Sequence, residues 1–175
     1  MIRALFPASF DPIHNGHIDI ALRAAQIFDQ VVVAVYSTPQ KNLLFPTETR
    51  VELVQGAFKT EPKIKVVTYH GLTVEFARQI DAQVIVRGLR ALSDFEYEFR
   101  MALANRQLAP SIETVSLITS KEHSFLSSTT VREIASLGGD VSSMVPPHVN
   151  KALNKRFADI KKNGEAEFEP SPPRD

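Results

Sequence analysis

The chain has 175 residues, 43% of them apolar, which suits one globular domain with a sizeable buried core. Lys plus Arg and Asp plus Glu both number 20, so the chain lacks the basic excess expected of nucleic-acid-binding or membrane-surface proteins. Cysteine is absent, which excludes disulfides, thiolate metal ligands and cysteine nucleophiles. No segment resembles a signal peptide or an apolar membrane span, and we therefore expect a cytoplasmic protein.

Five short runs rich in Val and Ile alternate along the chain with segments of helical periodicity. Apolar runs without polar alternation are typical of parallel strands that helices cover on both faces. The alternation predicts an α/β fold, a doubly wound five-stranded parallel sheet with helices on both faces. The predicted strands are Ile2–Phe6, Val31–Tyr36, Ile64–Thr68, Val84–Val86 and Thr114–Ile118.

Helical segments are predicted between and after these strands. Apolar residues recur at three- and four-residue spacing over 18–28, 51–58 and 74–80. Two capping boxes, each a hydroxyl residue three positions before a Glu, predict helix starts at Ser93 and Thr130.

The last predicted helix covers residues 148–160, with Pro146 and Pro147 at its entrance. Beyond it, the Gly-, Glu- and Pro-rich stretch 161–175 predicts a disordered tail. We therefore expect a single domain over residues 1–160.

The first predicted strand leads directly into a loop that carries two histidines. His14 and His17 flank Asn15 and Gly16, where a bound phosphate would meet the N-terminus of a helix. Because the helix dipole disfavours imidazolium there, a neutral His17 can donate an N–H to a phosphate oxygen. The alternative is that both histidines are ordinary loop and cap residues. A metal site is less favoured because no third His or Cys stands nearby in sequence.

Phosphate-binding residue types also follow three other predicted strands. Lys41 follows the second strand, Arg87 and Arg90 end the fourth, and hydroxyl residues 127–130 follow the fifth. The alternatives are a solvated lysine, arginines paired with carboxylates within 94–98, and a plain N-cap. Because parallel strands end at one edge of a sheet, we expect these loops to converge on a phosphate ligand.

These loops resemble those of the nucleotidyltransferase superfamily, whose H-x-G-H motif matches residues 14–17 and whose S-S-T-x-x-R signature matches 127–132. Further stretches closely resemble the bacterial phosphopantetheine adenylyltransferases, and the likeness extends from Ile2 to about Leu153. Those stretches are Arg87-Gly88-Leu89-Arg90, Asp94-Phe95-Glu96-Tyr97-Glu98, Ser9-Phe10-Asp11-Pro12 and Asn105-Arg106.

The resemblance implies adenylyl transfer from ATP to 4′-phosphopantetheine, giving dephospho-coenzyme A and pyrophosphate in coenzyme A biosynthesis. It implies direct in-line attack without a covalent intermediate, Mg²⁺ bound mainly through ATP with few direct protein ligands, a homohexamer, and coenzyme A as a feedback inhibitor. Nicotinamide-mononucleotide adenylyltransferases and glycerol-phosphate cytidylyltransferases share the first and last motifs, although residues 87–98 argue against both. A non-catalytic nucleotide-binding module and a Rossmann dehydrogenase are further alternatives, the latter weakened by the absent G-x-G-x-x-G.

Roles for individual residues follow from the same resemblance. His17 is expected to contact the α-phosphate, Ser9 to hydrogen-bond the attacking phosphate with Lys41 and Arg87 neutralising it, and Arg90 to hold the β- and γ-phosphates. The catalytic set is thus His17, Ser9, Lys41 and Arg90. The remaining expected ATP contacts are Phe10, Gly88, Leu89, Glu98, His123, Ser124, Phe125, Leu126, Ser127, Ser128 and Thr129, and those to the pantetheine arm are Thr73 and Asn105.

Three of these positions depart from the family pattern. Ser9 stands where many relatives have Thr, and the hydroxyl group is retained. His123 occupies a position that is often Trp, so we expect altered stacking on adenine and a pH-sensitive group near neutrality. Thr73 replaces a larger apolar residue of some relatives.

Overall fold

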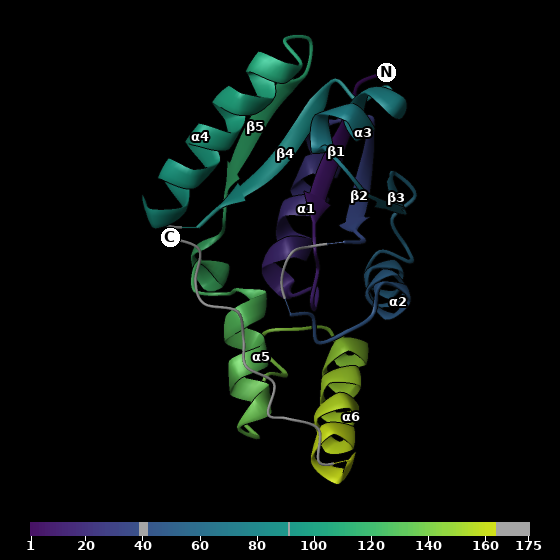
Figure 1. The fold of residues 1–175 in the computed structure, drawn as a ribbon, viewed down its shortest axis with the longest axis vertical. Helices are drawn as coiled ribbons and strands as arrows, with labels where there is room; N and C mark the ends of the chain where they lie inside the picture. Colours follow the sequence, from purple (N-terminus) through teal and green to yellow (C-terminus); the bar gives the residue numbers. More distant parts are fainter. Residues whose placement is uncertain (39–41, 91, 164–175) are drawn as a thin grey trace.

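Five parallel strands form one sheet in the order β3-β2-β1-β4-β5 (Figure 1). The computed structural model describes residues 1–38, 42–90 and 92–163. The parallel pairing and this strand order confirm the predicted doubly wound parallel sheet. Its strands are β1 Arg3–Ala8, β2 Gln30–Tyr36, β3 Ile64–Tyr69, β4 Val84–Leu89 and β5 Glu113–Ile118.

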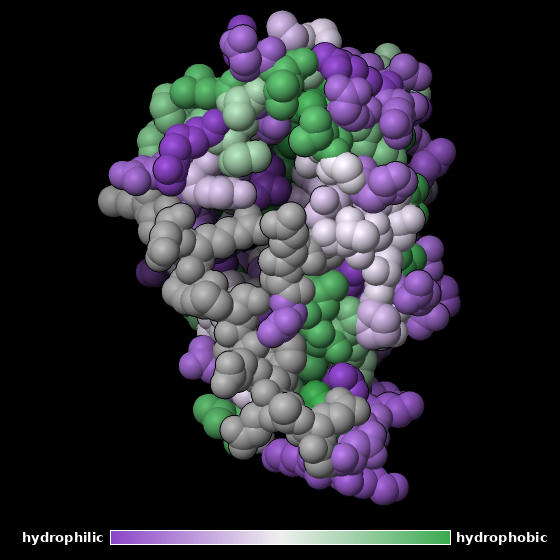
Figure 2. All heavy atoms as spheres, in the orientation of Figure 1, coloured by the Kyte–Doolittle hydropathy of each residue, from purple (hydrophilic) through white to green (hydrophobic). Residues whose placement is uncertain are grey.

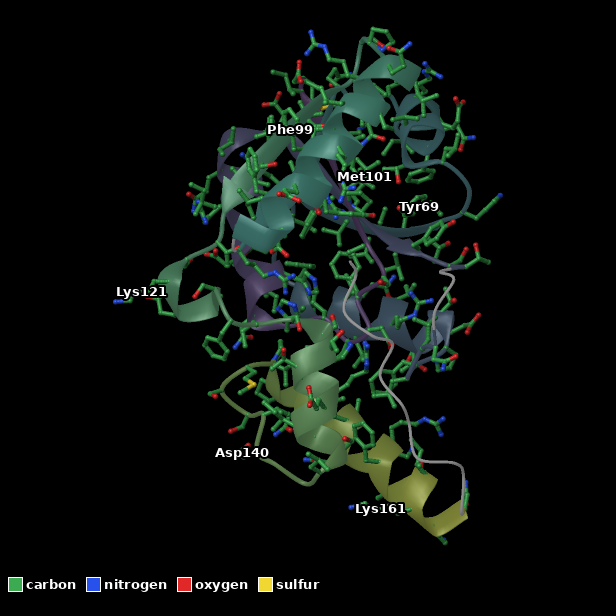
Figure 3. The ribbon with its side chains drawn as sticks, turned by 60° about the vertical axis from the view of Figure 1, so that its left-hand side comes forward. Tyr69, Phe99, Met101, Lys121, Asp140 and Lys161 are labelled. Carbon is green, nitrogen blue, oxygen red and sulfur yellow. The ribbon has the colours of Figure 1, made fainter. Side chains whose placement is uncertain are left out.

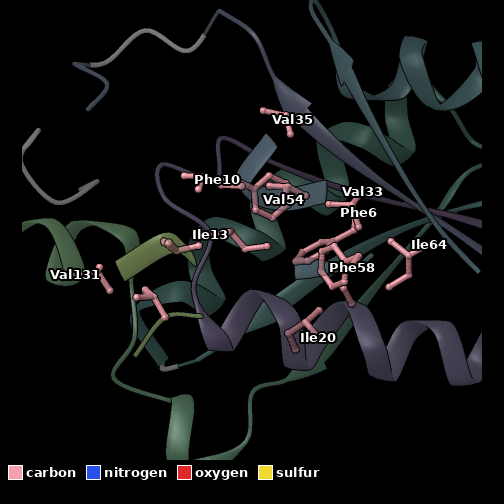
Figure 4. Close-up of a cluster of buried hydrophobic side chains, with 14 of the residues drawn as sticks. Phe6, Phe10, Ile13, Ile20, Val33, Val35, Val54, Phe58, Ile64 and Val131 are labelled. Atoms are coloured by element: carbon pink, nitrogen blue, oxygen red, sulfur yellow. The ribbon is translucent and has the colours of Figure 1, made fainter. Parts of the chain in front are cut away.

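Helices cover both faces of this sheet because successive side chains of each strand point to opposite sides. Phe6 packs in one apolar cluster with residues of α1 and α2, part of which Figure 4 shows, whereas Leu5 packs in a second cluster with residues of α3 and the segment after α4. Helices α5 and α6 lie beyond the carboxyl ends of the strands (Figure 1). The helical elements are α1 Asn15–Ile27, α2 Thr47–Ala57, α3 Thr73–Gln79, α4 Leu92–Leu108, the 3₁₀ turn η1 Lys121–His123, α5 Ser128–Ser136 and α6 Pro147–Asn163.

Both predicted capping positions are wrong. Helix α4 begins at Leu92, one residue before Ser93. Helix α5 begins at Ser128, because the side chain of Ser127 accepts the backbone N–H of Thr130 at 2.9 Å and so caps the helix three residues earlier than predicted.

The last helix begins at Pro147, one residue before the predicted start, and continues to Asn163, three residues beyond the predicted end. The rest of the predicted tail, 164–175, lies outside the described residues. Within the described ranges, no helix combines the length and the apolar character that crossing a bilayer requires.

Candidate active site

The sheet reverses its direction of growth between β1 and β4, which makes this the topological switch point where open α/β sheets bind ligands. The two strands pair only at Ala4↔Val84 and Leu5↔Ile85, whereas β1 and β2 pair along six positions. Beyond these pairs, the side chain of Arg87 bridges the two strands, since its Nη1 donates to the carbonyl of Pro7 at 2.8 Å. A cationic side chain is therefore built into the switch point.

The two motif histidines lie together at the start of α1. His14 is the N-cap residue, and its ring stacks on that of His17 with centroids 3.7 Å apart. The backbone N–H of His14 donates to Nδ1 of His17 at 3.3 Å, so we assign the ring proton of neutral His17 to Nε2. This tautomer supplies an N–H donor in the first turn of the helix, as a phosphate contact requires.

Burial and neighbouring charges disfavour the protonated form of His14. His14 is 4% exposed, and burial lowers its pKa well below 6.5, with further lowering by electrostatic repulsion from the neighbouring groups of His17, Arg90 and His123 when His14 is protonated. His123 closes over the motif from η1, since its Cβ lies 3.5 Å from where a Cβ on Gly16 would stand. The loops after β1, β4 and β5 therefore converge here.

Arg87 in β4 and Arg90 directly after it are both paired with carboxylates, as the alternative interpretation anticipated. Arg87 binds Glu98 through Nε at 2.7 Å and Nη2 at 2.6 Å, and Arg90 binds Asp94 through Nε at 2.9 Å and Nη2 at 3.1 Å. Burial alone would lower the pKa of Arg87, and the hydrogen bonds and charge of Glu98 more than offset it, so the pKa is raised.

These pairs leave hydrogen-bonding capacity for a ligand. A guanidinium has five N–H donors, and the contacts of Arg87 within the described residues use three of them: two to Glu98 and one to Pro7. Arg90 likewise spends two on Asp94 and one, at 2.8 Å, on the carbonyl of Leu126. Each carboxylate thus orients an arginine that can still donate to a phosphate.

The start of α5 is fixed against the other loops. Ser128 Oγ donates to the carbonyl of Pro12 at 2.9 Å, and Arg90 holds the carbonyl of Leu126. Ser127 caps the helix, whose first-turn N–H groups and positive dipole end suit an anion. The predicted convergence of the loops after strands one, four and five is confirmed.

Other predicted site residues lie in different surroundings. Phe10 is buried with a positive φ of 49°, and its ring packs edge-on against His17 with centroids 5.0 Å apart. Gly88 lies in β4, where a Cβ would stand 3.2 Å from Cγ1 of Ile20. Leu89 ends β4, Ser9 follows β1, and Ser124 and the exposed Phe125 follow η1 before Thr129 in α5.

The residues predicted for the second substrate are spread more widely. Thr73 opens α3 after β3, and its hydroxyl lies 3.2 Å from that of Tyr69. Asn105 stands in the fourth turn of α4, about 20 Å along the axis from the start of that helix. Lys41 lies outside the described residues. The roles given to these three residues stay predictions.

Sequence analysis missed three buried charged residues beneath the loops. Asp11, Arg50 and Arg132 are at most 2% exposed, and all three bind backbone atoms of the loop segments. Asp11 and Arg132 appear within the sequence motifs, but a motif does not reveal which way a side chain points. Arg50 lies in α2 outside every motif, and the only signal was a charged residue among the apolar positions of that helix.

Comparison with known proteins agrees with this geometry. The model of the cytidylyltransferase-like family matches residues 5–134. A phosphopantetheine adenylyltransferase from Roseiflexus sp. (strain RS-1) is 52% identical over 90% of this chain and 98% of the relative. The chain belongs to the phosphopantetheine adenylyltransferase family. A member from Gloeobacter violaceus is 55% identical over 89% of this chain and 96% of the relative, and one from Desulfitobacterium hafniense is 49% identical over 88% and 94%.

The fold is shared more widely than the family. A crystal structure from Vibrio parahaemolyticus, provisionally named a nicotinate-nucleotide adenylyltransferase, superposes with a TM-score of 0.67 at 20% identity, covering 88% of this chain and 99% of that one. At this identity the match supports the architecture alone.

Proposed function

We propose that this phosphopantetheine adenylyltransferase family member transfers the adenylyl group of ATP to 4′-phosphopantetheine, yielding dephospho-coenzyme A and pyrophosphate. The observation that carries the proposal is the placement of His17, Arg87 and Arg90 in the loops around the switch point of the sheet. The chain is also about half identical to named members of the family. A neutral donor and two arginines suit a triphosphate and a second phosphate better than any acyl or hydride chemistry.

The reaction needs positioning and charge stabilisation more than covalent help. An oxygen of the 4′-phosphate attacks the α-phosphorus of ATP in line, and the bond from that phosphorus to the bridging oxygen breaks as pyrophosphate leaves. Nε2–H of His17 would donate to an α-phosphate oxygen, where charge grows in the transition state. Arg90 and the N-terminus of α5 would bind the β- and γ-phosphates, which become the leaving group.

The attacking phosphate would approach from the β1 side of the switch point. Ser9 directly follows β1, and Arg87 reaches across to Pro7 of the same segment. We infer that the Ser9 hydroxyl and the remaining donors of Arg87 hold this phosphate, together with Lys41. Two neutralised phosphates can then approach each other to reacting distance.

We infer that Mg²⁺ accompanies ATP and lowers the negative charge of its phosphates. Three carboxylates near the phosphate-binding loops, Asp11, Asp94 and Glu98, are each paired with an arginine and so are poorly placed to act as direct ligands. Mg²⁺ readily keeps its waters and binds phosphate oxygens, which fits these residues.

We also propose that copies of the chain assemble through the outer surface of α4. Phe95, Phe99 and Leu103 repeat every four residues, and each is at least half exposed. Figure 2 shows apolar side chains gathered over the end of the molecule that holds α4 and β5, and Figure 3 places Phe99 on the outer surface of that helix. A continuous apolar stripe of this kind is typical of an interface. The homohexamer and coenzyme A inhibition rest on the family resemblance, and the expectation of a cytoplasmic location rests on the sequence, in which no segment resembles a signal peptide or a membrane span.

The experiment that tests the activity is pyrophosphate release from ATP and Mg²⁺ with different acceptors. We expect release with 4′-phosphopantetheine and none with nicotinamide mononucleotide or without acceptor. Release with nicotinamide mononucleotide instead would move the chain to another branch of the superfamily. If folded protein releases no pyrophosphate with any acceptor, the result would favour a non-catalytic nucleotide-binding module. Adding coenzyme A to the active reaction tests for product-type inhibition in the same assay.

A further inference from the structure

A buried carboxylate joins two loops beneath the site. Asp11 is 1% exposed, and its Oδ2 and Oδ1 accept the backbone N–H groups of Leu44 at 2.8 Å and Phe45 at 2.9 Å. A charge in such a place is tolerated only with hydrogen bonds and an opposite charge around it. Asp11 thereby attaches the segment between β2 and α2, which carries Lys41 three residues before Leu44, to the loop between β1 and α1.

The opposite charge comes from the last residue of the S-S-T-x-x-R signature. Arg132 of α5 is 2% exposed, and its Nη1 donates to the backbone carbonyl of Asp11 and lies 3.3 Å from Oδ2 of the same residue. Its Nη2 donates to Thr129 Oγ1 at 3.4 Å. The guanidinium therefore faces the first loop and not the exposed edge of the sheet.

A second buried cation, Arg50, binds the same two loops. Arg50 is fully buried and donates to the carbonyls of Ser9 at 2.6 Å, Tyr36 at 2.8 Å and Phe45 at 3.2 Å. Phe45 is thus held by its N–H to Asp11 and by its carbonyl to Arg50. A movement of residues 44–45 would therefore break hydrogen bonds that also hold the loop at 9–11.

We propose that Asp11 and Arg132 are positioning residues that hold three substrate loops in one arrangement. Through Asp11, Arg132 links the start of α5 to the loop that leads to His17 and to the segment that follows Lys41. In-line transfer requires the α-phosphate and the leaving phosphates to keep their alignment, and a shift of about 1 Å can cost about 10²-fold in rate. The inference rests on the proposed function and gives the signature arginine a role without phosphate contact.

The competing assignment is a direct contact between Arg132 and a phosphate of ATP. To make that contact, the guanidinium would have to move away from Asp11. The Asp11 carboxylate would then stay buried without an opposite charge, which is costly. The two assignments differ in what the loss of Arg132 does to the Leu44 and Phe45 amides, which bind Asp11.

Amide hydrogen exchange of the ligand-free protein provides the first test. In Arg132→Gln and in Asp11→Asn, we expect the Leu44 and Phe45 amides to exchange at least about tenfold faster than in the unaltered protein, because local opening becomes easier. Arg106→Gln serves as the control, since it breaks the exposed Arg106–Glu113 pair at the other end of the sheet. Unchanged exchange at both amides in Arg132→Gln overturns the proposal, and this readout does not depend on activity.

A double-mutant cycle on pyrophosphate release provides the second test. We expect each single variant to lower kcat by about 10²-fold, and the double variant Asp11→Asn/Arg132→Gln to lose no more than about threefold beyond the worse single variant, because the two residues act as one unit. A direct phosphate contact instead predicts that Arg132→Gln raises the ATP KM by the same factor with or without Asp11. That additive outcome would overturn the proposal.

The two tests separate the proposal from the proposed function. An unaltered protein that releases no pyrophosphate contradicts the adenylyl transfer, while the exchange data still decide whether Arg132 acts through Asp11. Should Asp11→Asn fail to fold, the exchange and the ATP dependence of Arg132→Gln alone remain decisive. Val149→Ala, a buried change in α6, controls for loss of activity through lower stability alone.

Discussion

Arg87 binds both carboxylate oxygens of Glu98, at 2.6 and 2.7 Å, while its third nitrogen donates to the carbonyl of Pro7 across the split between β4 and β1. The guanidinium of the switch point is thereby held in one orientation by α4 on one side and by β1 on the other. Since a planar guanidinium loses little entropy once held, a phosphate that binds it meets a preorganised partner.

Glu98→Gln should destabilise the fold by about 1–3 kcal/mol, because it leaves the partly buried Arg87 with a neutral partner. Urea denaturation followed by circular dichroism measures the change. Glu113→Gln, which breaks an exposed pair with Arg106, should cost less than about 1 kcal/mol. Equal effects of the two substitutions would contradict a special role for the Arg87–Glu98 pair.

His17→Ala should lower turnover by about 10²–10³-fold, the scale seen when a donor to a developing charge is removed. The reason is that Nε2–H of His17 would donate where charge grows on the α-phosphate. Pyrophosphate release at saturating substrates measures it, and His70→Ala, an exposed histidine, is the matched control. Unchanged turnover with weaker ATP binding would show that the histidine serves binding alone.

Lys41→Ala should weaken both 4′-phosphopantetheine binding and turnover, since the lysine is expected to neutralise the attacking phosphate. Initial rates over a matrix of both substrate concentrations separate the two effects. This prediction rests on the family resemblance because Lys41 lies outside the described residues. A change confined to the ATP dependence would mean that the residue has been given the wrong phosphate.

Stability should fall as the pH drops below about 6.5, in part through His14. Burial holds the pKa of His14 in the folded protein well below 6.5, so between that pKa and 6.5 the unfolded chain binds more protons. The free energy of unfolding then decreases by up to about 1.4 kcal/mol per pH unit from this group. Urea titrations at pH 5 to 8 should show a shallower slope for His14→Gln. Identical slopes would mean that folding does not lower the pKa of His14.

Phe99→Glu should dissociate the assembly that we propose for α4. The substitution puts a charge in the middle of the exposed stripe of Phe95, Phe99 and Leu103, and burying an unpaired charge in an interface is unfavourable. Analytical ultracentrifugation measures the species present. Lys161→Glu, a charge reversal in the last turn of α6, should leave the assembly intact. An unaltered protein that sediments as a monomer would refute the interface itself.

Local sequence patterns were sufficient for the architecture and for the chemical character of the loops. Val- and Ile-rich runs alternating with helical periodicity specify a covered parallel sheet, because burial on both faces requires apolar side chains at successive positions. The topology then brings the loops after β1, β4 and β5 to one edge, so His17, Arg90 and Ser127 could be expected together. The apolar pattern and the residue types at the strand ends can both be read from a single sequence, because they depend on residues that are neighbours in the chain.

Three-dimensional packing decided how those residues are held. Asp11 and Arg132 are 121 positions apart, and nothing in their local sequence indicates that they would be buried as a pair. Ser127 and not Thr130 caps α5. The next residue, Ser128, donates a hydrogen bond to the carbonyl of Pro12, which is a contact between distant loops. The burial of a charge depends on partners from elsewhere in the fold, since only they can compensate for the lost hydration.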